Sequence, residues 1–161
     1  MHHKYKEENI LLLKEYGLKV SKVYKNKFPK LIEVNQLIQD VTEEILEHIK
    51  NEETIIFPYI KELIELEKRK IHKNISTSPL DNSIKGIEDE HSKIGLAFKR
   101  ISELTNNYTI PENVCASFKL LYIKLQNFDE ELQEHIHIEN NILFPRAKKL
   151  ERKIRLQEEI A

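Results

Sequence analysis

Four long stretches of the sequence repeat apolar residues every three or four positions, and this period constrains the fold more than any other feature. The stretches cover about residues 2–25, 31–69, 81–107 and 111–152. Only 3 Gly and 5 Pro occur in the chain, too few for a sheet-rich fold with many tight turns. We therefore predict an all-α, up-down-up-down four-helix bundle in which residues 1–161 form a single domain.

Prolines and a polar loop mark the breaks and irregularities in these stretches. Pro29 ends the first stretch, because proline disfavours helix in the residue before it. The polar loop of residues 73–79 separates the second stretch from the third. Pro58 and Pro145 lie inside the second and fourth stretches, where we expect each to kink the helix.

Composition argues against several classes of function. The net charge of −1 gives no electrostatic support for binding nucleic acids or anionic membranes. One cysteine is too few for a disulfide framework, a cysteine-built zinc site or a cysteine-ligated iron–sulfur cluster within one chain. No apolar run approaches the roughly 20 residues that span a bilayer, and the first residues do not resemble a signal peptide. We expect a cytoplasmic protein that binds neither nucleic acids nor membranes.

An internal repeat carries the chemistry of the chain. The pattern E-H-I-x-x-E-x-x-I-[IL]-F-P occurs at residues 47–58 and again, 87 residues later, at residues 134–145. In each copy, His and Glu four residues apart lie about 40° apart around a helix and one turn along it, so both side chains reach one point. Imidazole and carboxylate together are ligands for iron, manganese or zinc. The two pairs are His48 with Glu52 and His135 with Glu139.

A His–Glu pair one turn apart is also typical of a solvated ion pair on a helix surface. Its recurrence with the same apolar residues and Phe-Pro behind it argues against that interpretation. Ile45, Ile49 and Ile56 lie within about 60° of the line through His48 and Glu52, so the pair faces the core. Buried His and Glu must pair with each other or bind a metal, because a lone buried charge is costly.

Two further histidines complete the predicted set. His91 lies on the apolar stripe of the third stretch; alone it is typical of a hydrogen-bonded core histidine, but beside two His–Glu pairs we predict a ligand. In the first stretch His2 and His3 compete, and we choose His3 because Ile10, seven residues on, shares its stripe. His137 points about 200° away from the ligand of the fourth stretch and is not included.

Four imidazoles and two carboxylates are too many for one ion, and they suit two. Each ion then takes two histidines, and both share Glu52 and Glu139 as bridges. An oxo or hydroxo bridge makes each ion five-coordinate, with one position open. We predict a non-haem di-iron centre, although manganese and zinc accept the same ligands. The predicted ligands are His3, His48, Glu52, His91, His135 and Glu139.

Three carboxylates are candidates to accept the second N–H of a ligand imidazole. Glu44 and Glu131 each lie four residues before a predicted ligand histidine, and Glu90 directly precedes His91. Solvation at the surface is an equally good interpretation for all three.

At these residues the chain resembles the hemerythrin-like HHE domains, and more closely the di-iron proteins that repair iron–sulfur clusters after nitrosative or oxidative damage. The resemblance covers nearly all of the chain. It rests on His2 and His3, the two repeat copies and residues 89–91, and residues 135–145 are its most specific part. It implies the same six metal ligands, damaged iron–sulfur proteins as partners, and NO or O2 as small ligands.

Three departures from the family pattern matter. Oxygen-carrying hemerythrins have a second histidine one turn after the ligand of the third helix, where this chain has Gly95. The repair family often begins with a small cysteine-bearing domain, which we expect this protein to lack. Family members also often carry a histidine late in the first helix, where this chain has Tyr24.

These observations lead to one expected function and two alternatives. Four imidazoles rather than five leave both irons under-coordinated, which favours iron donation or NO chemistry over reversible oxygen carriage. We therefore expect repair of damaged iron–sulfur clusters with iron from a labile site. The alternatives are an NO-binding or NO-reducing di-iron enzyme and an oxygen-binding or oxygen-sensing module, so the sequence leaves open whether the protein is an enzyme.

Overall fold

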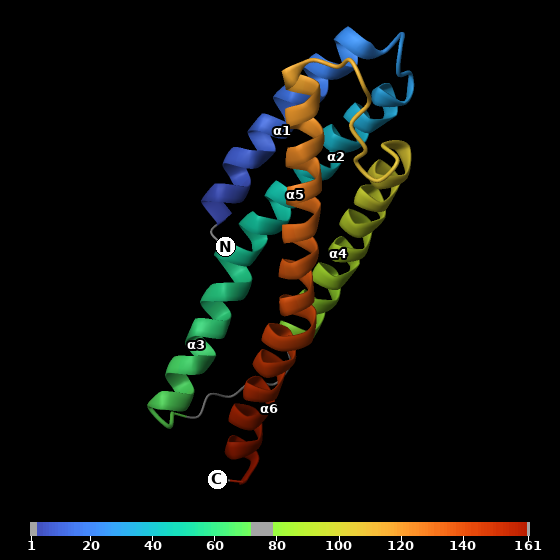
Figure 1. The fold of residues 1–161 in the computed structure, drawn as a ribbon. Helices are drawn as coiled ribbons and strands as arrows, with labels where there is room; N and C mark the ends of the chain where they lie inside the picture. Colours follow the sequence, from blue (N-terminus) through green and yellow to red (C-terminus); the bar gives the residue numbers. More distant parts are fainter. Residues whose placement is uncertain (1–2, 72–78, 161) are drawn as a thin grey trace. The chain divides into compact units, whose positions relative to one another are not determined.

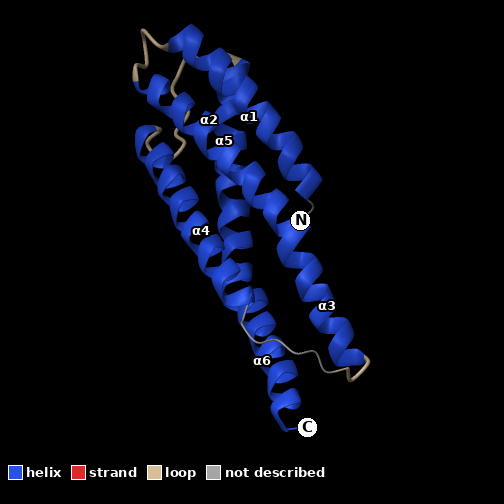
Figure 2. Ribbon diagram, turned by 180° about the vertical axis from the view of Figure 1, so that it is seen from behind, coloured by secondary structure: helices blue, strands red, loops and turns tan. Residues whose placement is uncertain are grey.

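A computed structural model describes the backbone of residues 3–71 and 79–160, and the side chains of residues 6–71 and 80–155. Every regular element in this described part is helical (Figure 2). None of the described helices is long and apolar enough to cross a membrane. Figure 1 labels the α-helices, and the elements in chain order are α1 (His3–Tyr24), α2 (Lys30–Asn51), the π-helical turn η1 (Glu52–Ile56), α3 (Phe57–Lys68), α4 (Pro79–Leu104), α5 (Ala116–Ile138), the π-helical turn η2 (Glu139–Leu143) and α6 (Phe144–Ile160).

The helical elements form four continuous stretches, because α2, η1 and α3 follow one another without a gap, as do α5, η2 and α6. The predicted all-α, four-helix class is therefore confirmed. Where we expected kinks at Pro58 and Pro145, the structure has a wide π-helical turn that ends just before each Phe-Pro pair. Proline has no N–H to continue the regular bonding, and the turn in front of it takes up one extra residue.

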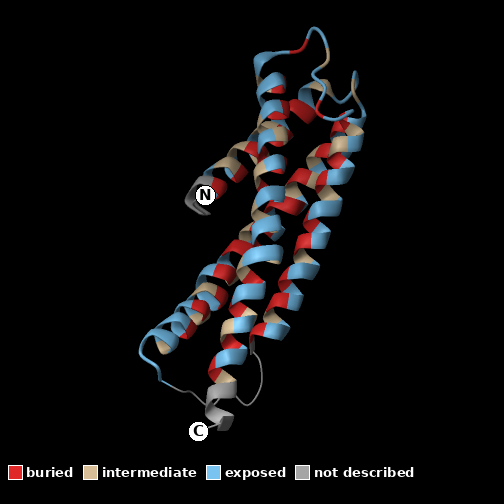
Figure 3. Cartoon of the chain, turned by 60° about the horizontal axis from the view of Figure 1, so that its bottom comes forward, coloured by how far each residue is buried: buried red, intermediate tan, exposed pale blue. Residues whose placement is uncertain are grey.

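The chain divides into two compact units, and unit 1 comprises Met1–Glu47 and Ser92–Gln133. Its successive helical segments run in opposite directions (Figures 1 and 2). Helices α1 and α2 approach closely at Gly17, where a Cβ atom would lie 3.0 Å from Asn35 Oδ1. Buried residues recur on one side of each helix (Figure 3). Fully buried side chains of this unit include Ile10, Leu13, Ile38, Ile45, Ile94, Ile101, Phe118 and Leu121.

The connection between α4 and α5 explains why the last helical stretch begins later than expected. Residues 106–108 all have positive φ angles, between 50° and 60°, a conformation that interrupts a right-handed helix. The Tyr108 hydroxyl donates to Asp129 Oδ2 at 2.7 Å, and the Tyr108 N–H donates to Thr105 Oγ1 at 3.0 Å. These bonds hold the connection in place, and α5 begins at Ala116 instead of near residue 111.

Unit 2 comprises His48–His91 and Glu134–Ala161. That residues 1–161 form a single domain stays a prediction. A buried carboxylate lies in its interior: Glu151 accepts hydrogen bonds from the Tyr59 hydroxyl at 2.5 Å and from Arg155 at 3.2 Å. Both copies of the repeat, from their histidine onward, belong to this unit. Its apolar core consists of Ile56, Ile60, Leu63, Leu80, Ile84, Ile87, Phe144, Ala147 and Ile154.

Candidate metal centre

Each glutamate of the repeat opens a π-helical turn. Glu52 is the first residue of η1 and Glu139 the first residue of η2. The Phe57 N–H donates to the backbone oxygen of Glu52, and the Phe144 N–H donates to that of Glu139. Single π-helical turns inside α-helices occur frequently at functional sites. Both copies therefore place an irregular turn at the residue that we predict to bind metal.

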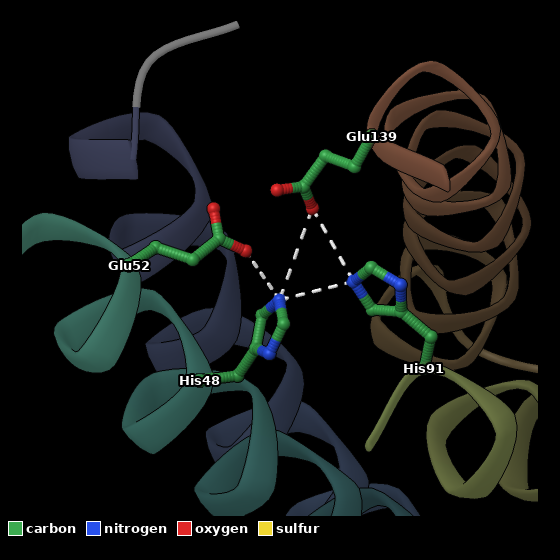
Figure 4. Close-up of side chains that lie close together, drawn as sticks. All are labelled: His48, Glu52, His91 and Glu139. Carbon is green, nitrogen blue, oxygen red and sulfur yellow. Dashed lines mark hydrogen bonds and ion pairs between the residues drawn. The ribbon is translucent and has the colours of Figure 1, made fainter. Parts of the chain in front are cut away.

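Four buried side chains of unit 2 converge on one point (Figure 4). They are His48 at the end of α2, Glu52, His91 from α4, and Glu139. Each offers one possible ligand atom, and these four atoms lie within 4.8 Å of one another. The two carboxylate residues are the most buried of the four, with 0% of Glu52 and 2% of Glu139 exposed. Carboxylates enclosed in this way require a cationic or metallic partner.

The imidazoles turn their Nε2 atoms toward these carboxylates. His48 Nε2 contacts Glu52 Oε1 and lies 3.9 Å from Glu139 Oε1. His91 Nε2 lies 3.3 Å from Glu139 Oε1 and 3.2 Å from His48 Nε2. Two imidazole nitrogens and carboxylate oxygens that face one small volume form a donor set for iron, manganese or zinc.

His135 joins this arrangement from the end of α5. Its Nε2 atom lies 2.9 Å from Glu139 Oε1 and 3.9 Å from Glu52 Oε2. Its side chain is 19% exposed, whereas that of His48 is 6% exposed. The structure thus brings together five of the six residues predicted as ligands, and His135 is the most accessible of the five.

The electrostatics of the cluster follow from two buried carboxylates beside three imidazoles. Burial lowers the pKa of His48, but its hydrogen bonds to Glu139 and Glu52 outweigh burial and raise the pKa to about 10. Burial raises the pKa of Glu139, but contacts with His135, His48 and His91 hold it well below the usual range. In the metal-free protein a proton on His48 therefore balances part of the buried negative charge. A bound cation would take the place of that proton.

The Nδ1 atoms of two imidazoles, those of His48 and His91, each contact a side-chain oxygen. Glu90 Oε2 lies 2.6 Å from His48 Nδ1, and Asn140 Oδ1 lies 3.0 Å from His91 Nδ1. Such partners set the tautomer and the orientation of a ligand imidazole, so that Nε2 faces the metal. Glu90 thus contacts a histidine of another helix rather than its own neighbour. The sequence did not predict a role for Asn140. The one feature that could have indicated it is its place as a polar residue directly after the predicted ligand Glu139.

Several predicted or competing residues lie elsewhere. Glu44 is exposed and Glu131 is half-buried, and their roles stay predictions. The side chain of His3, like the whole of His2, lies outside the described residues, so the ligand from the first helix also stays a prediction. His137 is exposed and accepts a hydrogen bond from Asn141 Nδ2 at 3.0 Å.

The chain is similar in sequence to several known proteins. The chain is 30% identical over 143 residues to the iron-sulfur cluster repair protein ScdA of Staphylococcus haemolyticus, covering 89% of this chain and 61% of that protein. It is 28% identical over 146 residues to ScdA of Staphylococcus epidermidis, covering 91% and 62%. It is 36% identical over 107 residues to the iron-sulfur cluster repair protein YtfE of Yersinia pseudotuberculosis, covering 66% and 43%.

The chain therefore spans about three-fifths or less of the length of these relatives. Within this chain, residues 1–147 match the family described as the hemerythrin HHE cation binding domain. This range includes both copies of the repeat and His91. The chain, with its buried cluster of His and Glu, belongs to the hemerythrin HHE cation-binding family.

Proposed function

We propose that this protein holds a pair of iron ions in the His/Glu cluster and supplies iron for the repair of iron–sulfur clusters damaged by nitrosative or oxidative stress. One observation carries the proposal: three imidazoles direct Nε2 atoms at two buried carboxylates in unit 2. Membership of a cation-binding family supports the metal. The names of the relatives, iron-sulfur cluster repair proteins, support the process and damaged iron–sulfur proteins as partners.

The donor set fits two ions better than one. Glu139 Oε1 lies within 4 Å of imidazoles from three different helical stretches, and Glu52 faces His48 and His135. Carboxylates that lie between histidines of different helices suit a bridging role, which a single ion would not need. His3 is the sixth proposed ligand, and an oxo or hydroxo bridge completes the proposed centre. Bound in this way, iron would supply exchangeable metal and open coordination positions.

The chemistry of the donors suits iron that must leave again. Imidazole and carboxylate are harder ligands than the thiolates that hold iron–sulfur clusters. A damaged cluster with free thiolates or sulfides therefore offers iron a softer binding site. Glu90 and Asn140 keep the imidazoles of His48 and His91 oriented, so that the site can be refilled without rearrangement.

An iron-transfer assay tests the proposal. The protein is loaded with radioactive iron and mixed with a dehydratase whose cluster has lost one iron. Recovered dehydratase activity and labelled iron in the dehydratase are both measured. A chelator that captures free ferrous iron is present, so that transfer between proteins is distinguished from simple release.

Variants give this assay its controls. His135→Ala removes one proposed ligand, and we expect it to reduce bound iron and transfer together. His137→Ala changes an exposed histidine two residues away and should behave as the unchanged protein. If the loaded protein keeps all its iron and the dehydratase stays inactive, the repair proposal is wrong even where iron binding is real.

A further inference from the structure

At one end of unit 1, α1 turns into α2 and α4 connects to α5 (Figure 1). Residues of these two connections line a cavity. Its volume is about 430 Å³, within the range of small-molecule sites, which measure roughly 300–1,000 Å³. None of the proposed metal ligands lines it. Its apolar walls are made by Phe28, Pro29, Leu31, Val34, Leu104 and Pro111.

Tyr122 adds a polar group to this apolar cavity. The residue lines the cavity and is only 5% exposed, yet its hydroxyl has no hydrogen-bond partner among the described residues. The other buried tyrosine of the unit, Tyr108, donates to Asp129. Burial raises the pKa of Tyr122 to about 12, so the phenol is neutral and able to donate at physiological pH. The hydroxyl oxygen is not among the fully enclosed polar atoms that lack a partner, so water reaches it, and a ligand in the cavity can take the place of that water.

The charges that line the cavity have one sign. Lys27 and Lys30 contribute exposed ammonium groups, and the described lining includes no Asp or Glu. The nearby Glu33 is engaged by Arg100, whose Nε lies 2.7 Å from Glu33 Oε2. The rim is therefore complementary to an anion.

The walls of the cavity are fixed before any ligand arrives. Thr105, which lines the cavity, donates to the backbone oxygen of Ile101 at 2.9 Å. Thr109, another lining residue, donates to the backbone oxygen of Asn106 at 2.5 Å. A preformed cavity spares a ligand the entropy of ordering these segments.

We propose that this cavity binds a small organic acid with an apolar, hydroxyl-bearing body. The apolar walls cover the body, Tyr122 exchanges a hydrogen bond with the ligand hydroxyl, and Lys27 with Lys30 binds the carboxylate at the rim. This site is separate from the proposed metal centre and does not depend on it.

Two probes that differ by one hydroxyl test the proposal: 3-(4-hydroxyphenyl)propanoate and 3-phenylpropanoate. Each is titrated into the isotope-labelled full chain while amide NMR shifts are followed. We expect saturable shifts at Thr105, Asn106 and Thr109, with a Kd for the hydroxylated probe on the order of 1 mM, as for other ligands of about 12 heavy atoms. The probe without the hydroxyl should bind more weakly.

Substitutions assign the contacts. Tyr122→Phe should weaken the hydroxylated probe about three- to tenfold, the range for one hydrogen bond, and leave 3-phenylpropanoate unchanged. It should not alter thermal unfolding, because the hydroxyl has no protein partner to lose. Lys27→Gln combined with Lys30→Gln should weaken both probes about two- to fivefold. Lys19→Gln, at an exposed lysine that contacts Ser117 instead, is the matched control.

Three results would overturn the proposal. The first is the absence of saturable shifts at these residues up to 10 mM probe, on the order of ten times the expected Kd. The second is an equal effect of Tyr122→Phe on both probes. The third is unchanged binding in the double lysine variant.

Discussion

The two copies of the repeat present the same ligands in different surroundings. In both, Glu opens a π-helical turn, His lies four residues before it, and Phe follows the turn. In the first copy Ile56 is buried and Phe57 half-buried, whereas in the second Leu143 is half-buried and Phe144 fully buried. The copies thus agree where a metal would bind and differ in how they pack. The ligand pattern and the packing pattern of one motif are therefore separable properties.

The largest expected difference between the copies concerns the two phenylalanines. Phe144→Ala should lower the free energy of unfolding by about 3–5 kcal/mol, because it empties a fully enclosed core position. Phe57→Ala should cost about 1–2 kcal/mol, because that ring already keeps part of its surface in water. Urea unfolding of the metal-free variants measures both. Equal losses would mean that the copies pack alike.

The two glutamates should differ less, and in metal affinity rather than stability. Glu139→Gln and Glu52→Gln should each weaken ferrous iron binding about a hundredfold or more. Replacing a residue that only hydrogen-bonds to a metal ligand typically costs about tenfold to hundredfold. Among the described residues, Glu139 contacts three imidazoles and Glu52 contacts two, so we expect the larger loss for Glu139. Anaerobic competition with a chelator gives the affinities. Two irons per chain retained in both variants would contradict a bridging role.

The partners behind the imidazoles sharpen the comparison further. Glu90→Gln should weaken iron binding about tenfold, because a carboxylate orients His48 through a charge-assisted bond. Asn140→Ala should weaken it about threefold, because the bond to His91 involves a neutral amide. The same competition assay applies, with His137→Ala as the unchanged reference. A larger effect at Asn140 would show that His91 matters more than His48.

A further expected effect is a dependence of stability on pH. The pKa of His48 is raised to about 10 in the folded chain, above the value near 6.5 of an unfolded histidine. The resulting stabilisation is fully present below pH 6.5 and is lost as the pH rises toward 10. The metal-free protein should therefore lose about 1–2 kcal/mol between pH 7 and 9.

Urea unfolding at several pH values tests this dependence. A His48→Gln variant lacks the proton and should show a flatter profile. The iron-loaded protein should show no such loss, because iron and the proton compete for the same nitrogen. Stability of the metal-free protein that rises between pH 7 and 9 would mean that His48 is neutral in it.

Much of the fold was predictable because its signals are local. The 3.6-residue period shows which side of each helix is buried, and the same phase turned His48 and Glu52 inward, where the structure has both buried. The inward placement of His91 followed from its apolar stripe. The all-α class needed no knowledge of contacts between distant residues.

The remainder depends on contacts that no period reports. Phe-Pro in each copy predicted an irregular helix, but it did not indicate a π-helical turn in which the N–H of Phe57 or Phe144 donates to the backbone oxygen five residues before it. The contact of Glu90 with His48 joins two helices, whereas the sequence only suggested its own neighbour. The late start of α5 depends on Tyr108, whose unusual backbone is held by its bond to Asp129.

The unequal exposure of the histidines bears on the order in which the cluster would open. His135 shows 19% of its side chain to solvent, and the side chains of His48 and Glu52 show 6% and 0%. We therefore expect an incoming chelator or acceptor thiolate to reach His135 at the end of α5 before it reaches His48 or Glu52. If the cluster holds the proposed pair of iron ions, we expect the ion nearest His135 to leave before the other.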